Sequence, residues 1–272
     1  MMVLADARHI PLRDGCVQCV VTSPPYWGAQ RDYGVPGQLG HERTPEAFVG
    51  IMADVFDDVA RVLKSDGVLW LNIGDSYAAS GKGGGGSMMA KRPDAWSHRA
   101  HLTGWRSAPA GYKSKDLVGV PWMLAFELRR RGWYLRRDVV WAKVSATEPT
   151  RADRPSTAHE FVFLMTRAEH YRYDGTAHPQ GSVWRFSSDG ASGAHFATMP
   201  EKLAERCILA GSRPGDLVLD PFGGSGTTVR VARRFNRRGV MLDLNPAYLE
   251  LAKQRNAHLQ PSVLDIADED SA

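Results

Sequence analysis

The amino-acid sequence predicts an α/β protein with a doubly wound, mostly parallel sheet and helices on both faces. Two observations lead to this prediction. Short apolar runs alternate with segments of helical periodicity, and a glycine-rich turn joins one such run directly to a helix. The chain has 272 residues, of which 43% are hydrophobic, so it can bury a large core. It is expected to form one large domain with a substantial insertion.

Six apolar runs have the length and composition of buried strands. They are rich in Val, Leu and Ile, which is typical of parallel strands that are covered on both faces. The predicted strands are residues 17–21, 68–73, 139–141, 161–165, 217–219 and 240–242. The sheet is therefore expected to be built largely from parallel strands.

Five segments between or after these runs show helical periodicity. The first begins with Thr44, Pro45 and Glu46, a combination that is typical of an N-cap and a first helical turn. The predicted helices are residues 44–63, 121–131, 200–210, 227–235 and 246–259. Residues 79–116 show no sustained period and contain a run of glycines, which predicts a long loop or a small inserted lobe.

Charge is distributed unevenly along the chain. The chain holds 34 Lys and Arg residues against 30 Asp and Glu residues, and its formal net charge is +4. Residues 262–272 hold four acids and no base, so the remainder carries +8. Residues 79–115 hold seven bases against Asp94 alone, interleaved with three aromatic residues. Positive charge beside aromatic rings suits a nucleic acid, and the alternative is a solvated loop that keeps the core soluble.

The composition also excludes several classes of protein. Because no apolar stretch reaches the length of about 18 residues that a membrane span requires, no membrane-spanning helix is expected. The N-terminus lacks the basic and apolar regions of a secretory signal, and three cysteines cannot build a disulfide framework. A cytoplasmic protein is therefore expected.

A glycine-rich loop follows the apolar run at residues 217–219. Its sequence is Asp220-Pro221-Phe222-Gly223-Gly224-Ser225-Gly226-Thr227-Thr228. Glycines let the backbone approach a ligand, and the free N–H groups of a helix N-terminus favour anionic groups. Asp243 ends the next apolar run, where nucleotide-binding α/β folds place the acid that binds ribose hydroxyls. The pair indicates an adenosine-containing cofactor, with a purely structural turn as the alternative.

A second loop follows the apolar run at residues 17–21. Its sequence is Thr22-Ser23-Pro24-Pro25-Tyr26-Trp27. The prolines stiffen a loop at the carboxyl end of a strand, where open α/β sheets bind ligands. The Ser23 hydroxyl and the Pro24 carbonyl can accept hydrogen bonds from an amino group, and a neighbouring aromatic ring can stack on a planar substrate. The alternative is a turn whose Tyr26 and Trp27 only fill the core.

Together the two loops resemble the motifs of the S-adenosylmethionine-dependent DNA amino-methyltransferases of the beta group. The glycine-rich loop resembles the cofactor motif of that family, and Ser23-Pro24-Pro25-Tyr26 resembles its catalytic motif. Further segments resemble other blocks of the family, namely residues 67–77, 132–143, 158–163 and 196–203. The resemblance covers nearly the whole chain outside residues 79–116.

The resemblance implies a circularly permuted Rossmann-like methyltransferase fold with a mostly parallel, seven-stranded sheet, because the catalytic loop precedes the cofactor loop. It places the catalytic half in residues 1–78 and the rest of the methyltransferase domain, with the cofactor site, in residues 117–261. The basic and aromatic pattern, not the resemblance, assigns DNA recognition to the inserted, loop-rich segment 79–116; the beta group often carries that region before the cofactor motif, where residues 167–195 stand here. Residues 262–272 are expected to form an acidic disordered tail. The resemblance also implies that the chain begins at the third strand of the fold. Asp6 is then expected beside the adenine of the cofactor, with a surface acid that caps a turn as the alternative.

The resemblance further implies S-adenosyl-L-methionine as cofactor and double-stranded DNA as substrate, with no metal ion. The implied catalytic residues are Ser23, Pro24, Pro25 and Tyr26. The implied cofactor-binding residues are Asp6, Thr198, Asp220, Phe222, Gly223, Gly224, Ser225, Gly226, Thr227 and Asp243. The residues expected to contact DNA are Trp27, Lys82, Lys91, Arg92, Arg99, Arg106, Lys113 and Arg136. A homodimer and a cognate restriction endonuclease are left open.

The target base follows from the first position of the catalytic motif. In this family Ser at that position is associated with the N4 amine of cytosine, and Asp or Asn with the N6 amine of adenine. Ser23 therefore predicts methylation of a cytosine that is flipped out of duplex DNA. The alternatives are an adenine-N6 enzyme of the same fold and a DNA-binding module without turnover. Methylation of a ring carbon needs a thiolate, typically after a proline, and none of the three cysteines follows one.

Overall fold

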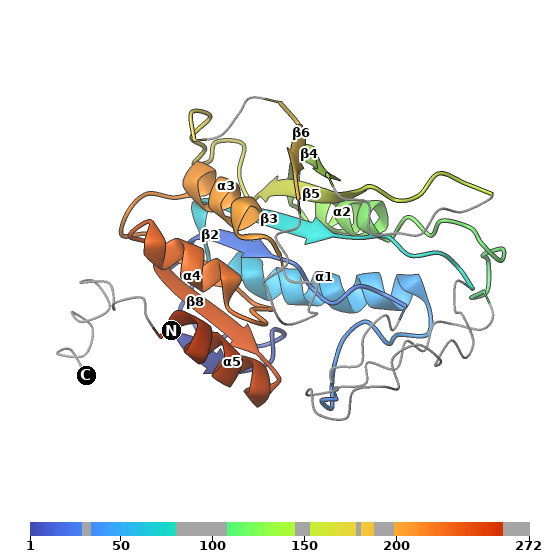
Figure 1. Ribbon diagram of the computed structural model, residues 1–272, viewed down its shortest axis with the longest axis horizontal. Helices are drawn as coiled ribbons and strands as arrows, with labels where there is room; N and C mark the ends of the chain where they lie inside the picture. Colours follow the sequence, from blue (N-terminus) through green and yellow to red (C-terminus); the bar gives the residue numbers. More distant parts are fainter. Residues whose placement is uncertain (29–33, 80–107, 145–152, 178–180, 188–198, 258–272) are drawn as a thin grey trace.

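The computed structural model describes residues 1–28, 34–79, 108–144, 153–177, 181–187 and 199–257 (Figure 1). Most of the inserted segment and all of the acidic tail lie outside these ranges. Several predicted site residues also lie outside the described residues, namely Lys82, Lys91, Arg92, Arg99, Arg106 and Thr198. Their roles stay predictions.

The described residues form one eight-stranded sheet in the order β1-β8-β7-β2-β3-β5-β4-β6. The strands are β1 (Met2–Leu4), β2 (Val17–Thr22), β3 (Leu63–Ile73), β4 (Tyr134–Lys143), β5 (His159–Thr166), β6 (Val183–Phe186), β7 (Leu217–Asp220) and β8 (Arg238–Asp243). Of the strands that the structure describes, β5 alone runs antiparallel to its two neighbours, β3 and β4. The predicted mostly parallel sheet is therefore confirmed, but it has eight described strands where the resemblance implied seven.

Two of the eight strands carry no clear signal in the sequence. β1 has three residues, which is too short for a period to be visible. β6 has four residues with exposed and buried side chains in alternation, as expected for a strand at the edge of a sheet. It pairs with β4 alone among the described strands and accounts for the additional strand.

Among the described residues, five helices cover the sheet, and all five were predicted to within about three residues at each end. They are α1 (Pro45–Val62), α2 (Val120–Arg130), α3 (Glu201–Gly211), α4 (Thr227–Arg234) and α5 (Pro246–Asn256). Thr44 caps α1 as predicted, because its side chain accepts a hydrogen bond from the Ala47 N–H. No described helix is both long enough and apolar enough to cross a membrane.

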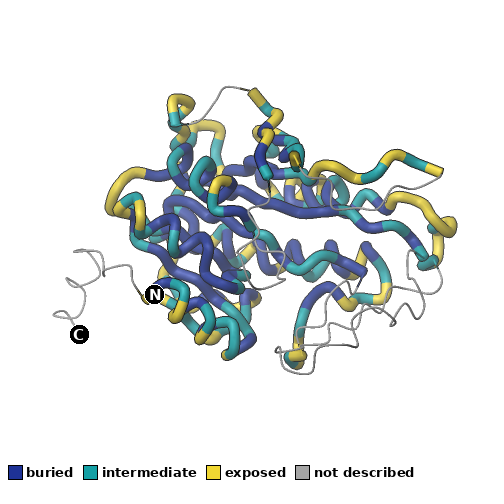
Figure 2. The backbone as a smooth tube through the Cα atoms, viewed as in Figure 1, coloured by how far each residue is buried: buried dark blue, intermediate teal, exposed yellow. Residues whose placement is uncertain are grey.

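Alternate residues of the central strands point to opposite faces of the sheet. Val20 and Leu69 pack in the same hydrophobic cluster as α1 and α2. Cys19 and Val21 pack instead in the cluster that contains α3 and part of α4. Both faces are therefore covered, and the central strands are buried along their length (Figure 2).

The strand order places strands from the N-terminal and the C-terminal parts of the described chain side by side. β2, from the N-terminal part, pairs in parallel with β7, from the C-terminal part, with Cys19 opposite Val218. β1 pairs in parallel with β8, with Leu4 opposite Asp243. This arrangement confirms the circular permutation. Because parallel neighbours end at the same edge, the loops after β2, β7, β8 and β1 all emerge on one side of the sheet.

Candidate active site

The loops after β2 and β7 are joined directly by the buried carboxylate of Asp220. One oxygen, Oδ1, accepts hydrogen bonds from Thr22 Oγ1 at 2.7 Å and from the Phe222 N–H at 3.1 Å. The other, Oδ2, accepts from Thr228 Oγ1 at 2.7 Å. Asp220 is 3% exposed, so these three donors replace the water that a free carboxylate would bind. One side chain thus connects the end of β2, the loop after β7 and the start of α4.

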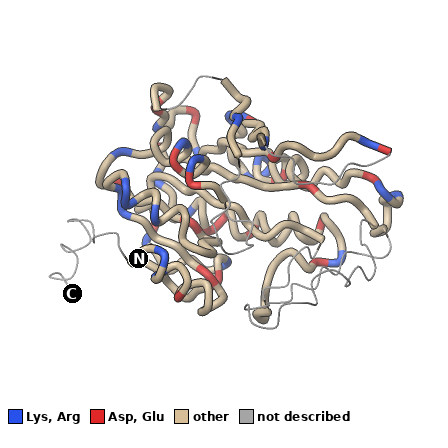
Figure 3. The backbone as a smooth tube through the Cα atoms, in the orientation of Figure 1, with Lys and Arg blue, Asp and Glu red and all other residues tan. Residues whose placement is uncertain are grey.

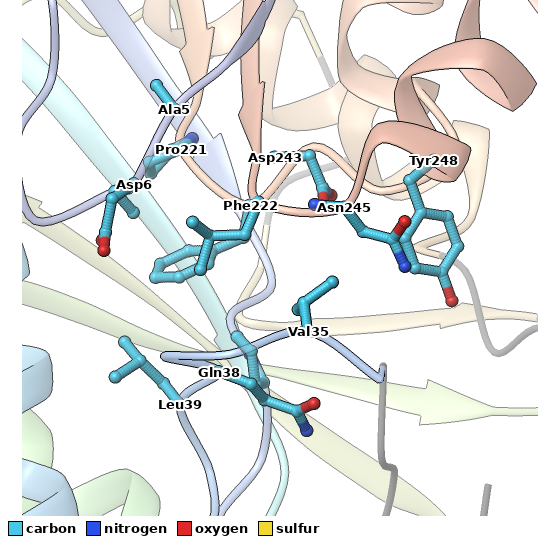
Figure 4. A pocket seen from close by; sticks show the side chains of 13 residues that line it. Ala5, Asp6, Val35, Gln38, Leu39, Pro221, Phe222, Asp243, Asn245 and Tyr248 are labelled. Carbon is cyan, nitrogen blue, oxygen red and sulfur yellow. The ribbon is translucent and has the colours of Figure 1, made fainter.

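A pocket opens where these loops meet the N-terminal loop (Figure 4). It is lined by Ala5, Asp6, Ala7, Pro25, Val35, Gln38, Leu39, Pro221, Phe222, Asp243, Leu244, Asn245 and Tyr248. Figure 4 shows Phe222 at its centre, with Asp6 on one side and Asp243 on the other. Pro25 comes from the predicted catalytic loop and Phe222 from the predicted cofactor loop. The two loops therefore contribute to one cleft, as the sequence predicted.

The glycine-rich loop packs closely against α5 and fixes one carboxylate of this pocket. Gly226 has a φ of +80°, and a Cβ there would lie 2.9 Å from the Ala252 Cβ, so α4 can approach α5 only with glycine at this position. The Gly224 N–H donates to Asp243 Oδ2 at 2.9 Å and fixes that carboxylate. Of the ten predicted cofactor-binding residues, Asp6, Phe222 and Asp243 line the pocket. Asp220, Gly223, Gly224, Ser225, Gly226 and Thr227 are not part of the lining.

The two acidic residues of the pocket differ in their electrostatic surroundings. Arg8 donates to both carboxylate oxygens of Asp6, and this side-chain contact lowers the pKa of Asp6. Burial raises the pKa of Asp243, and the backbone N–H groups of Asn245 and Gly224 oppose that rise. A carboxylate beside an apolar surface made by Phe222, Val35 and Leu39 fits a nucleoside, whose ribose is polar and whose base is flat.

The predicted catalytic loop lies next to the pocket and is only half-buried at its functional side chains. Ser23 and Tyr26 are partly exposed, whereas Pro24 is buried. The Tyr26 hydroxyl donates to Glu160 Oε2 at 2.8 Å, and Ser23 Oγ lies 3.5 Å from the Tyr26 hydroxyl. A Cβ on Gly74 would lie 2.5 Å from Tyr26 Cε2, so the ring packs directly against that glycine. The Tyr26 ring is therefore held on two sides.

The predicted role of Trp27 in contacting DNA is wrong. Its side chain is 1% exposed and belongs to the core cluster with α1, and its indole N–H donates to the Glu42 carbonyl at 3.0 Å. Ser76 Oγ donates to the Trp27 carbonyl at 2.8 Å, which holds the backbone of the loop as well. For this residue the alternative reading of the sequence, an aromatic ring that fills the core, is the correct one.

Asp75 has a structural role that the sequence did not indicate. It follows β3 and accepts hydrogen bonds from the N–H groups of Gly119 and Val120, each at 3.0 Å from Oδ1. These groups open α2, so the carboxylate caps that helix. Burial raises the pKa of Asp75, and the backbone donors, including the Ser76 N–H, oppose that rise.

Three of the described basic residues lie in different parts of the structure. Arg136 lies at an irregularity in the β4–β5 pairing, seven residues before Lys143. At 3.3 Å per residue, Arg136 is therefore about 23 Å from Lys143, which stands at the end of β4 beside the catalytic loop. Arg131 is bound by Asp54, Asp57 and Glu127. Lys113, by contrast, belongs to the loop that bonds to Ala78 just after β3, on the side of the catalytic loop. Figure 3 shows charges of both signs interspersed along the described chain.

Several residues at the site were missed in the sequence. Pocket residues Val35, Gln38 and Leu39 come from a loop without a recognisable pattern. Glu160 and Lys143 stand within segments that resemble family blocks, and Asn72 stands in a third, but no role was predicted for any of the three. The signal available was a charged or amide residue within or next to an apolar run.

A family model described as DNA methylase matches residues 17–254. The Type II methyltransferase M.Cfr9I of Citrobacter freundii is 41% identical over 274 residues, covering 97% of this chain and 88% of the relative. The Type II methyltransferase M.XycI of Xanthomonas campestris pv. cyanopsidis is 43% identical, with the same coverage of both chains. These similarities extend over both loops and the pocket.

Two solved structures show the same fold. A Thermus thermophilus protein, assigned as a DNA modification methylase and crystallised with S-adenosyl-L-methionine, has a TM-score of 0.66 at 25% identity and covers 96% of this chain and 94% of its own. The cytosine-N4-specific PvuII DNA methyltransferase has a TM-score of 0.70 at 21% identity, covering 99% and 89%. The second likeness concerns the fold alone.

Proposed function

The chain belongs to the DNA methylase family, and from this premise we propose that it methylates the exocyclic N4 amine of a cytosine flipped out of duplex DNA. The methyl donor is S-adenosyl-L-methionine. The observation that carries the proposal is the shared cleft: Pro25 of the catalytic loop and Phe222 of the cofactor loop line one pocket, and Asp220 bonds the two loops together.

The pocket residues fit the cofactor. Asp243 is positioned by the Gly224 N–H to accept from ribose hydroxyls, while Phe222, Val35 and Leu39 offer an apolar surface to the adenine. Asp6 and its partner Arg8 stand at the other side of Phe222, where the adenine amine is expected. When bound, the cofactor supplies a methyl group on a positive sulfonium, which is already an activated donor.

In the proposed mechanism, the exocyclic amine of the base donates hydrogen bonds to the catalytic loop. The lone pair of an exocyclic amine is conjugated into the ring, so the free base is a poor nucleophile. Ser23 Oγ and the Pro24 carbonyl accept the two N–H groups and favour a pyramidal nitrogen, which localises the lone pair. Tyr26, fixed against Gly74, offers the flat face on which a flipped base can stack.

DNA reaches the site from the edge of the sheet at which β2 and β3 end. Lys113 and Lys115 lie in the loop beside Ala78, and Arg154 lies 3.9 Å above the Tyr77 ring. Lys115 and Arg154 both pair with Asp153, and on DNA binding these cations would exchange that carboxylate for phosphate oxygens around the extruded base. The enzyme is proposed to act in the cytoplasm, where chromosomal DNA is accessible, and a cognate endonuclease would make it part of a restriction-modification pair.

We expect the protein to transfer a labelled methyl group from S-adenosyl-L-methionine to unmethylated, mixed-sequence DNA. Digestion of that DNA to nucleosides should place the label in N4-methylcytosine. Label in N6-methyladenine would keep the mechanism and replace the target base. DNA that remains unlabelled, with the same protein shown to be folded, would favour a binding module and overturn the proposed function.

Replacing Gly74 by alanine should lower kcat about tenfold or more without unfolding the chain. The new Cβ would lie 2.5 Å from Tyr26 Cε2 and 3.0 Å from Cδ2, so the ring must move from the position at which it would stack on the base. Methyl transfer to mixed-sequence DNA measures the effect.

Gly50→Ala is a matched control for this variant. Gly50 lies within α1, and a Cβ there would meet no atom within 4 Å, so the same chemical change should leave transfer intact and raise helix stability slightly. Equal activity of Gly74→Ala and Gly50→Ala would show that the Tyr26 ring position does not matter for catalysis.

A further inference from the structure

A partly buried ion pair lies next to the catalytic loop and has no part in the mechanism described so far. Lys143 Nζ and Glu160 Oε1 are 2.5 Å apart, and their side chains are only 18% and 15% exposed. Glu160 Oε2 accepts from the Tyr26 hydroxyl at 2.8 Å and from Asn72 Nδ2 at 3.1 Å. Glu160 therefore serves three donors, one of which belongs to the catalytic motif.

The sheet register brings these residues together. Lys143 ends β4, Glu160 stands near the start of β5, and Asn72 lies near the end of β3, so the three strands meet at the edge where β2 releases the catalytic loop. Asn72 also donates to the Phe161 carbonyl at 3.2 Å and is 2% exposed, which fixes its amide orientation. The cluster is thus part of the rigid sheet, whereas Ser23 and Tyr26 stand on a loop.

The donors around Glu160 fix the direction of the hydrogen bonds. Lys143 can only donate, and the Asn72 amide nitrogen can only donate, so Glu160 acts as an acceptor on both oxygens. The Tyr26 hydroxyl must then give its proton to Glu160, and its oxygen is left to accept the proton of Ser23 Oγ, 3.5 Å away. Ser23 in turn presents lone pairs on its remaining side.

We propose, on the basis of the proposed function, that Glu160 is a positioning residue. It sets the direction of the hydrogen bonds from Ser23 through Tyr26 and thereby makes Ser23 Oγ an acceptor for the exocyclic amine of the target base. An amine bound to an aromatic ring offers N–H groups, so a serine that donated towards it would compete for the lone pair needed in the reaction. The chain of hydrogen bonds from Ser23 through Tyr26 to Glu160 removes that possibility, and the ion pair with Lys143 holds the Glu160 carboxylate in place.

Glu160→Gln disturbs the direction of the hydrogen bonds around residue 160 and hardly changes the shape of the side chain. If the amide oxygen faces Tyr26 and Asn72, the amide nitrogen faces the Lys143 ammonium, and two donors oppose each other. If the amide is turned, its nitrogen faces the Asn72 donor and the Tyr26 hydroxyl. Neither orientation satisfies all three partners. Changing Lys143 to methionine removes the opposing ammonium and lets the amide oxygen return to Tyr26 and Asn72.

The test compares wild type, Glu160→Gln, Glu160→Gln with Lys143→Met, Tyr26→Phe, and Glu160→Gln with Tyr26→Phe. Methyl transfer to unmethylated, mixed-sequence DNA gives kcat and KM, and thermal unfolding monitors the fold. We expect Glu160→Gln to lower kcat about tenfold with KM for DNA nearly unchanged. Adding Lys143→Met should restore most of kcat. Adding Tyr26→Phe to Glu160→Gln should lower kcat no further than the more severe of the two single changes.

The outcomes separate this inference from the proposed function. Wild type without methyl transfer would end the proposed function and this inference with it. With active wild type, three results would each overturn the inference alone: unchanged kcat in Glu160→Gln, no recovery on adding Lys143→Met, or losses of Glu160→Gln and Tyr26→Phe that multiply. A purely structural role would lower kcat only in parallel with thermal stability and would show no recovery specific to Lys143→Met.

Discussion

Replacing Ser23 by alanine is expected to lower kcat for methyl transfer by about 100-fold or more, because an interaction with the reacting group is lost. Ser23 Oγ is the hydroxyl that accepts from the amine in the proposed mechanism, and the neighbouring Tyr26 hydroxyl, 3.5 Å away, is bound to Glu160. The fold should survive, because the Tyr26 hydroxyl keeps its bond to Glu160 and Asp220 keeps Thr22 in place.

The measurement is single-turnover methyl transfer to mixed-sequence DNA at saturating S-adenosyl-L-methionine. Ser65→Ala is the control, because Ser65 is an exposed serine in β3, at the end of the sheet away from the catalytic loop. Its activity should equal that of wild type. Wild-type kcat in Ser23→Ala would remove the hydroxyl from the mechanism and leave the backbone carbonyl as the acceptor.

The sequence could predict the loops of this site because their signals are local. The Asp220–Thr228 and Thr22–Trp27 segments each follow an apolar run, and the carboxyl ends of parallel strands share one edge of a sheet. The resemblance then gave the order of the motifs, from which the place of Asp6 beside β8 follows. No contact between distant residues was needed for these predictions.

Roles that depend on strand register could not be predicted in the same way. Glu160 reaches Tyr26 across 134 residues of sequence, and only the pairing of β5 with β3 and β4 brings the two together. The role of Trp27 was predicted wrongly for a related reason. An aromatic residue beside a catalytic loop looks the same in sequence whether it faces the cleft or α1, and the Glu42 carbonyl that binds its indole lies in a segment with no pattern.

Asp220 was predicted to bind the cofactor, and the structure gives it instead three protein donors and no place in the pocket lining. Burial raises the pKa of Asp220 from 3.8 to about 6, and the hydrogen bonds from Thr22, Thr228 and the Phe222 N–H oppose that rise. The Asp220 carboxylate is therefore a positioning group. Keeping it ionised in the core lowers the stability of the folded chain.

The sign of this cost follows from linkage. A carboxyl whose pKa is higher in the folded than in the unfolded chain contributes most stability below the unfolded pKa, and that contribution is lost as the pH rises through the folded pKa. The gap between 3.8 and about 6 corresponds to about 3 kcal/mol. Wild type should therefore lose about that amount between pH 4 and pH 7 through Asp220 alone.

Asp220→Asn should remove this pH dependence and keep the geometry. Its amide oxygen can accept from Thr22 and the Phe222 N–H, while its amide nitrogen can donate to Thr228 Oγ1, whose own proton can turn to the Val21 carbonyl, 3.3 Å away. Alanine would leave all of these donors unpaired in the core and is the poorer test. Methyl transfer should stay within about tenfold of wild type, because the loops remain joined.

Urea unfolding of both proteins between pH 4 and pH 8 measures the difference. The stability of Asp220→Asn relative to wild type should rise by about 3 kcal/mol across pH 4 to 7 and then level off. Asp14→Asn controls for the loss of one carboxylate at the surface, since Asp14 is 76% exposed beside Arg61, and its difference from wild type should vary far less. A constant difference for Asp220→Asn would mean that burial does not hold this carboxyl near its neutral form, and that its bonds to Thr22 and Thr228 stabilise the charge fully.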